Sequence, residues 1–230
     1  MITLGEILKE SKTTAEQPRV TAIREPVSRK PVSRAVSVHD EQIQALVQQL
    51  FFQHESKPVR HLGFAPIEIS TTTANLCLEV ATALAEEGRY DVGLIDAHTD
   101  SAPLPTQLQI PSPIRAGAPW PIAPRLWMVP RQSWRPDADR HRLTEQNLSR
   151  LRDLTTEFDF SILWCAPVSW LTASIAQACD GLVLVLSANK TRRLVASQIK
   201  DELSRAQVPV LGVVLAGRSF PVPQGLYRSL

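Results

Sequence analysis

The 230-residue chain has no long apolar run, only three cysteines and little excess charge. No window reaches the roughly 18 apolar residues that a membrane-spanning helix needs, so we expect no such span. The opening stretch "MITLGEILKES" lacks a basic segment followed by a long apolar one, so we do not expect a secretory signal. A formal net charge of +2 gives no general electrostatic argument for nucleic-acid binding.

The three cysteines, Cys77, Cys165 and Cys179, all lie in apolar stretches. Their odd number and their spacing suit neither a disulfide framework nor a zinc site. Cys165 falls at a strand end, where α/β proteins often have sites, but no histidine accompanies it in a readable motif. We therefore expect buried, reduced thiols in a cytosolic protein.

The N-terminal part is predicted to lie outside the main domain. Thr3 and Glu6 have the spacing of a capping box, so residues 1–11 are predicted to form a short capped helix. Such a helix is not stable alone in water, so it should fray or act as a docking peptide. Residues 12–38 are poor in large apolar side chains and predict a mostly disordered basic linker. Contact of this linker with anionic lipid or acidic protein is the alternative to a simple tether.

Residues 39–230 are predicted to form one α/β domain. An amphipathic helix with Asp40 as its N-cap comes first, and from Val59 onward apolar strand segments alternate with helical ones. The expected strands are "VRHLGFAPI", "DVGLIDA", "RLWMVP", "FSILWCAPV", "GLVLVLSA" and "VPVLGVVLAG". Nearly continuous apolar strands indicate burial on both faces. The pattern predicts a three-layer domain with a mainly parallel β-sheet flanked by helices.

Residues 101–125 interrupt this alternation with a proline-rich segment. Proline removes backbone donors, so the segment cannot be a central strand or an intact helix. We expect a surface loop, with a polyproline-type ligand for another domain as the alternative.

Five motifs occur in an order that resembles a known family. They are "STTTANL" after the first strand, "LIDAH" at 94–98, "FDFSILWCAP" at 158–167, "ACDGLVLVL", and "LGVVLAG". This order resembles the partition-type (deviant Walker) P-loop ATPases and, more closely, the bacterial tyrosine autokinases of exopolysaccharide synthesis. The resemblance implies a P-loop NTPase-like fold.

The chain departs from this family where the chemistry would occur. Pro66 and Glu68 stand in place of the loop glycines, although proline has no N–H and cannot adopt positive φ. Ile69 replaces the lysine that contacts the β- and γ-phosphates. Ser70 keeps the hydroxyl that would bind Mg²⁺. The resemblance implies a vestigial nucleotide site made of Pro66, Ile67, Glu68, Ile69, Ser70, Thr71, Thr72, Asp96, His98 and Trp164.

Two carboxylates of the family's site are also replaced, one by His98 and one by Trp164, while Asp96 is kept. Losing one transition-state contact typically costs roughly 3–4 kcal/mol, and several are missing here together. We expect Asp96 to be a hydrogen-bonded strand-end residue and Trp164 to fill the cleft. His98 has no partner at metal spacing, so it is not expected to be a ligand. Thr71 or Thr72 is expected to cap the following helix, with weak anion binding at its N-terminus as the alternative.

We therefore expect no catalytic residue, cofactor or metal, and a pseudo-kinase that acts as an interaction module in capsular or exopolysaccharide biosynthesis or export. It would be cytoplasmic, or peripheral at the inner membrane face, with a polysaccharide co-polymerase or a kinase paralogue as partner. One alternative is an active ATPase or tyrosine kinase that uses ATP and Mg²⁺, with Arg60, His98 or Lys190 replacing the loop lysine. Another is a partition-type positioning adaptor, based only on the basic linker. The family's tyrosine-rich tail is represented by Tyr227 alone.

Overall fold

The structure, a computed structural model, describes residues 38–53, 58–70, 72–99, 101–113, 117–136, 143–188, 191 and 193–217. The helix predicted at 1–11 and nearly all of the linker predicted at 12–38 lie outside these ranges. Among the residues described, no helix combines the length and apolar character that crossing a membrane requires.

A seven-stranded sheet forms the centre of the domain, in the order β3-β4-β2-β5-β1-β6-β7. Its strands are β1 (His61–Pro66), β2 (Val92–Ala97), β3 (Trp120–Ala123), β4 (Leu126–Val129), β5 (Phe160–Cys165), β6 (Gly181–Ser187) and β7 (Val210–Ala216). Neighbouring strands are parallel except β3 and β4, which are antiparallel. The predicted mainly parallel sheet is therefore confirmed.

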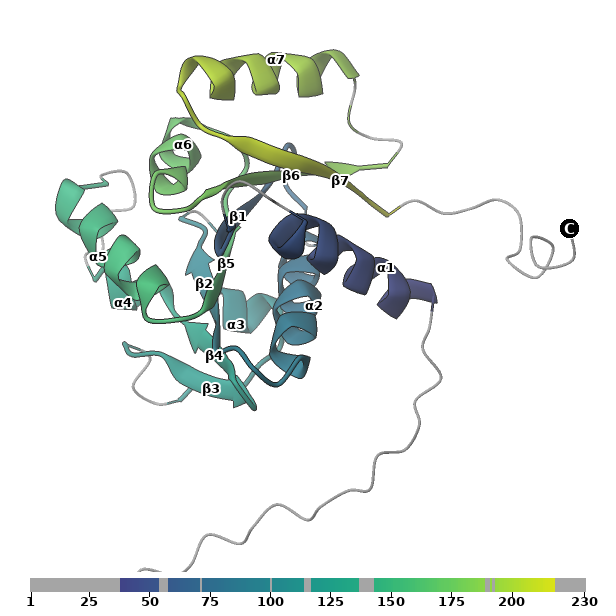
Figure 1. The fold of residues 1–230 in the computed structure, drawn as a ribbon. Helices are drawn as coiled ribbons and strands as arrows, with labels where there is room; N and C mark the ends of the chain where they lie inside the picture. Colours follow the sequence, from purple (N-terminus) through teal and green to yellow (C-terminus); the bar gives the residue numbers. More distant parts are fainter. Residues whose placement is uncertain are drawn as a thin grey trace, which may run out of the picture. The chain divides into compact units, whose positions relative to one another are not determined.

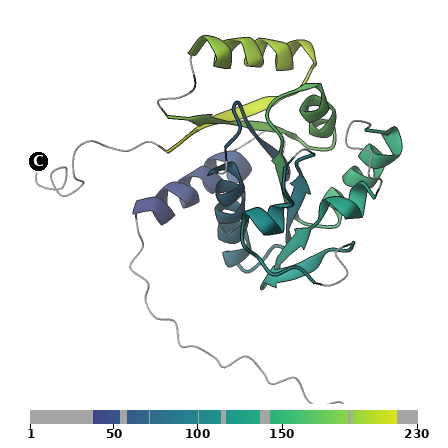
Figure 2. The ribbon, with the colours of Figure 1, turned by 180° about the vertical axis from the view of Figure 1, so that it is seen from behind.

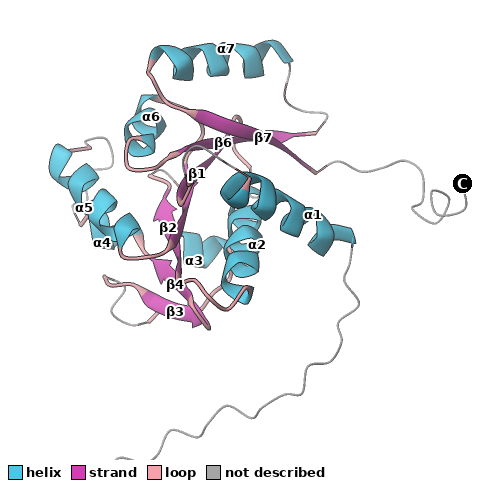
Figure 3. Ribbon diagram, in the orientation of Figure 1, coloured by secondary structure: helices cyan, strands magenta, loops and turns pink. Residues whose placement is uncertain are grey.

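Helices cover both faces of this sheet (Figures 1 and 3). One face packs against α1 (Val38–Val47), the π-helical turn η1 (Gln48–Phe52), α2 (Thr72–Glu86) and α3 (Leu104–Gln107). The other packs against α4 (Arg131–Trp134), α5 (Glu145–Thr156), α6 (Trp170–Ala176) and α7 (Arg193–Arg205). Each face has its own apolar core, so the predicted three-layer arrangement is also confirmed.

The first helix differs from the prediction at both ends. It begins at Val38, so Asp40 lies within its first turn and the prediction of an Asp40 N-cap is wrong. An acidic residue in this turn still interacts favourably with the helix dipole. At the other end the helix widens into η1, and this wider turn directs two successive residues, Leu50 and Phe51, into the core.

The proline-rich segment 101–125 is more ordered than the predicted surface loop. It contains the short helix α3 and the strand β3, so that prediction is wrong in part. Leu104 of α3 is buried in the core, which anchors the segment to the domain. Pro121 is compatible with β3 because this strand lies at the sheet edge and pairs only with β4.

Phe51 and Phe52 provide a matched test of how η1 covers the sheet. Phe51 is 4% exposed and its ring meets Phe160 edge-on at 5.3 Å between centroids, whereas Phe52 is 40% exposed. We expect Phe51→Ala to lower the free energy of unfolding by about 3–5 kcal/mol, since it leaves a cavity in the core. Phe52→Ala should cost roughly half as much or less, because folding removes less of the apolar surface of Phe52 from water. Urea denaturation measures both, and equal losses would contradict this packing.

Candidate functional site

The predicted site residues meet at the carboxyl edge of the sheet. β1, β2 and β5 are neighbouring parallel strands, so the segments that follow them lie side by side at the edge where open α/β sheets bind ligands. Trp164 is paired in register with Asp96 on one side and with Phe64 on the other. The structure therefore brings together the strand-end positions that the sequence predicted, while Thr71 lies outside the described residues.

The segment after β1 continues the sheet before it turns into α2. Pro66 is still paired in register with Val185 of β6, and the Ile67 N–H donates to the Val185 carbonyl at 3.1 Å. The Pro66 carbonyl accepts the Val168 N–H at 3.2 Å. Pro66 has no N–H, and that of Ile67 is used in the sheet, so neither can bind phosphate in this arrangement.

The side chains of this segment do not supply the charge or the metal contact of a phosphate loop. Ile69, at the lysine position, is 92% exposed, and Glu68 is also exposed. The Ser70 Oγ accepts the Thr72 N–H at 3.2 Å, which gives this hydroxyl a role at the helix start. Thr72 is the first residue of α2, so the prediction that it caps this helix is wrong. The same prediction for Thr71 stays untested.

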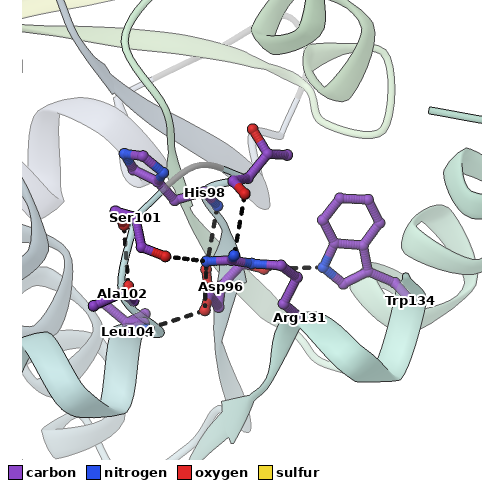
Figure 4. Close-up of polar contacts among 8 residues, drawn as sticks. Asp96, His98, Ser101, Ala102, Leu104, Arg131 and Trp134 are labelled. Carbon is purple, nitrogen blue, oxygen red and sulfur yellow. Dashed lines mark hydrogen bonds and ion pairs between the residues drawn. The ribbon is translucent and has the colours of Figure 1, made fainter. Parts of the chain in front are cut away.

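Asp96 is completely buried at the end of β2, and its carboxylate joins three segments (Figure 4). Its Oδ1 accepts the His98 N–H at 3.2 Å, and its Oδ2 accepts the Leu104 N–H at 3.0 Å. The second bond supplies a cap to α3, whose own N-cap position, Pro103, offers no side-chain acceptor. The Asp96 carbonyl accepts the Trp134 Nε1–H at 2.9 Å, which attaches α4 to the same strand end.

Arg131, the first residue of α4, neutralises this carboxylate from inside the fold. Its guanidinium lies 3.3 Å from Asp96 Oδ1 and also donates to the carbonyls of Thr99 and Ser101. Burial raises the pKa of the Asp96 carboxyl above its usual value, and the Arg131 charge acts in the opposite direction. The predicted hydrogen-bonded, strand-end role of Asp96 agrees with this geometry.

Sequence reasoning missed Arg131, because nothing in "VPRQSW" marks an arginine that reaches back to another strand. The parallel pairing of β2 with β4 is what places it there. A signal was nevertheless available. A carboxylate at the end of a buried strand needs a counter-charge or several donors, and Arg131 follows the next expected strand directly.

His98 and Trp164 pack together beside this network. Their ring centroids lie 4.6 Å apart, and both side chains are buried. Trp164 therefore places a buried apolar ring near the end of β5. An indole can only donate a hydrogen bond and cannot bind a cation through oxygen.

The groups at this edge do not fit Mg²⁺–ATP. A phosphate loop needs several backbone N–H groups and a cation, and Mg²⁺ requires oxygen ligands such as a free carboxylate. The Asp96 carboxylate is committed to Arg131 and to two backbone donors, and the exposed Glu68 adds negative charge to the segment where a phosphate would lie. Within the described ranges, no group of three His, Cys, Asp or Glu side chains is arranged to hold a metal.

Of the three cations suggested as substitutes for the loop lysine, the structure describes Arg60 and His98. Arg60 directly precedes β1, at the amino edge of the sheet, and its backbone N–H donates to Asp180. It therefore lies at the wrong end of the strand. Lys190 falls outside the described residues, and the buried His98 stacks on Trp164.

The thiols give no nucleophile at this site. Cys165 ends β5 and is completely buried, and burial raises its pKa to about 12. Burial also raises the pKa of Cys77 well above its usual value. Because the thiolate is the reactive form, neither cysteine is activated at neutral pH. The prediction that Cys165 belongs to the core is confirmed.

The Asp96–Arg131 pair predicts a pH-dependent loss of stability when the arginine is removed. We expect Arg131→Met to lower the free energy of unfolding by about 3–5 kcal/mol at neutral pH, because it leaves a buried carboxylate without its counter-charge. Without Arg131 the folded-state pKa of Asp96 rises further. The variant then loses stability as pH rises through that pKa, so its deficit should shrink in acid.

Arg125→Met is the matched control for that experiment. Its partner is Asp91, and the two side chains are 46% and 53% exposed. Loss of an exposed pair should cost less than about 1 kcal/mol, with little pH dependence. Urea denaturation of both variants between neutral and mildly acidic pH measures the difference. A deficit of Arg131→Met that is the same at every pH would contradict the proposed neutralisation.

Comparisons with known proteins find the fold but no close relative in sequence. No family model and no curated protein matches the chain. A crystal structure of the chimerical protein CapA2B2 superposes with a TM-score of 0.66 at 15% identity, covering 80% of this chain and 86% of that one. The kinase domain of the Escherichia coli tyrosine kinase ETK gives 0.59 at 14%, with 87% and 88% covered. A ParA family ATPase from Chlorobium tepidum gives 0.55 at 15%, with 68% and 73% covered.

These structures confirm the predicted P-loop NTPase-like fold. They relate the chain, by structure and at low identity, to bacterial tyrosine kinase domains and ParA-type ATPases.

Proposed function

We propose that this chain is a catalytically degenerate, tyrosine-kinase-like protein that acts as an interaction or regulatory module. The observation that carries the proposal is the state of the retained carboxylate. Asp96, the one acidic residue kept from the family's site, is held by Arg131 and two backbone N–H groups inside the fold. In this arrangement the residue that would assist phosphoryl transfer serves to hold α3 and α4 in place instead.

The neighbouring positions support the same proposal. Phosphoryl transfer depends on cancelling charge with a lysine and Mg²⁺, and on a loop whose N–H groups surround the phosphates. Ile69 gives no charge, the Ile67 N–H is bonded to β6, and Trp164 fills the end of β5. The loss of several such groups together leaves little transition-state stabilisation.

Exposed apolar residues at the carboxyl edge support a role in protein binding. Ile69, between β1 and α2, is 92% exposed, and Trp170, at the start of α6, is 67% exposed. The preceding strands β1 and β5 are parallel neighbours, and the Val168 N–H is bonded to the Pro66 carbonyl, so the two segments are adjacent. Exposed aromatic and aliphatic side chains gathered on one edge are typical of protein contact sites.

The proposed partner follows from the structural likeness to bacterial tyrosine kinase domains and from the sequence resemblance to those of exopolysaccharide synthesis. We propose the cytoplasmic part of a polysaccharide co-polymerase, or an active kinase paralogue, as the partner. The N-terminal helix predicted at residues 1–11 is a second proposed contact with it.

The first test is titration of the purified 230-residue chain with Mg²⁺–ATP and Mg²⁺–ADP by calorimetry. We expect no saturable heat at millimolar nucleotide, because Ile69 stands at the lysine position and the Asp96 carboxylate is already bound to Arg131. An active tyrosine kinase domain of the same fold, titrated in the same buffer, serves as the positive control. Saturable binding in the micromolar range would overturn the proposal and restore the enzyme alternative.

A second test concerns the partner-binding edge. We expect Ile69→Glu to weaken binding of the co-polymerase cytoplasmic segment, or of the kinase paralogue, by at least about tenfold, because it places a charge in an apolar contact. Ser149→Glu is the control. It adds the same charge at an exposed position of α5, which packs on the face of the sheet opposite α2. Biolayer interferometry measures both. Equal affinities for the two variants would exclude this edge as the contact.

A further inference from the structure

The last strand of the sheet, β7, has no strand paired to its outer edge among the residues that the structure describes. Its seven residues, "VLGVVLA", carry no charge, and Val213 and Leu215 are 59% and 51% exposed. The opposite edge strand, β3, is four residues long and contains Pro121. Proteins usually protect edge strands with charge, proline or a bulge, because an unprotected edge pairs with other strands. Within the described ranges, β7 has a bulge only at its start, near Leu211, where its register against β6 shifts.

The backbone of β7 offers hydrogen bonds at the same positions. The Ala216 carbonyl accepts the Ala188 N–H, so Ala216 faces β6. Backbone groups alternate in direction along a strand, so Val214 and Gly212 also face β6, whereas Val213 and Leu215 direct their N–H and carbonyl groups away from it. The two exposed apolar side chains are therefore on the residues whose backbone is available for a further strand.

The helices on either side leave this edge accessible. α7 lies over one face of β7 and α1 over the other (Figures 1 and 2). A groove of about 730 Å³ separates β7 from α1 and α2, and another of about 380 Å³ lies between β7 and α7. A strand placed beside β7 would therefore extend the sheet and have room for its side chains on both faces.

We propose that β7 pairs with β7 of a second copy of this chain, in antiparallel orientation, to form a continuous sheet across a two-fold axis. The regular part of β7 after the bulge is residues 212–216, so the axis passes beside Val214. Val213 of one copy then forms a hydrogen-bonded pair with Leu215 of the other, and Val214 faces its own equivalent. This inference does not depend on the proposed function.

The absence of charge on β7 is what makes a second copy the fitting occupant. A two-fold axis brings each residue of the interface close to its own copies, so a charged strand would meet like charges. Here the pairing instead places Val213 of each copy opposite Leu215 of the other, and all four side chains lie on one face of the sheet. Strand pairing alone buries a small area compared with the about 800 Å² per partner of a standard interface. We therefore expect weak association, with a dissociation constant of roughly 10–100 µM.

Sedimentation velocity of the full chain from a few micromolar to a few hundred micromolar tests the proposal. We expect a concentration-dependent monomer–dimer equilibrium. Val213→Lys and Leu215→Lys should each raise the dissociation constant at least about tenfold, because each places lysines on both sides of the axis. Both positions are more than half exposed, so the fold should persist, which circular dichroism checks. Trp170→Lys, a change of another exposed apolar residue, should leave the equilibrium unchanged.

A cysteine pair tests the register. Val214→Cys should form an intermolecular disulfide under mild oxidation, since opposed non-hydrogen-bonded residues lie about 4.5 Å apart at Cα, within disulfide range. Val213→Cys should not form one, because position 213 of one copy lies opposite Leu215 of the other, two residues away from its own equivalent. A monomer at all concentrations would overturn the proposal. Residues 218–230, or a strand of another protein, would then be the remaining candidates for pairing with this edge. A dimer insensitive to both lysine variants would overturn it as well.

Discussion

The burial of the Asp96 carboxylate is the constraint on which the carboxyl edge of this domain depends. A carboxylate with a side-chain exposure of 1% is stable only if donors and a counter-charge surround it. The fold meets this requirement from three directions, with the His98 N–H in the following turn, the Leu104 N–H at the start of α3, and the Arg131 guanidinium from α4. One side chain thus connects the turn after β2 with both α3 and α4.

The segment after β1 is held by sheet pairing rather than by an ion pair. A phosphate loop keeps its backbone N–H groups free by curving away from the sheet early, which requires glycine. Here the strand continues to Pro66, and the next N–H, that of Ile67, bonds to β6, so neither residue offers a free N–H. Ile69 and Trp170 then face solvent at the edge where a ligand would otherwise bind. Sheet pairing, ion pairing and apolar exposure together favour a binding surface over a catalytic cleft.

The sequence predicted the parts of the fold that periodicity and strand composition determine. Nearly continuous apolar segments such as "GLVLVLSA" and "FSILWCAPV" predicted β6 and β5. It failed where tertiary contacts decide. A four-residue strand such as β3 forms because β4 provides a partner, and α3 forms because Asp96 caps it, neither of which a local pattern shows. The Arg131 contact was missed because 35 residues separate it from Asp96, and only the pairing of β2 with β4 brings the two together.

The Asp96–Arg131 pair also bears on how retained residues are interpreted in evolution. Once an aspartate has acquired an internal counter-charge and caps a helix, selection for folding alone is enough to keep it, even in a lineage that has lost the original chemistry. Its presence in a family comparison then reports a need for stability and says nothing about turnover. The residue to inspect in such a comparison is the one that follows the neighbouring strand, because an arginine there identifies an aspartate that is already engaged within the fold.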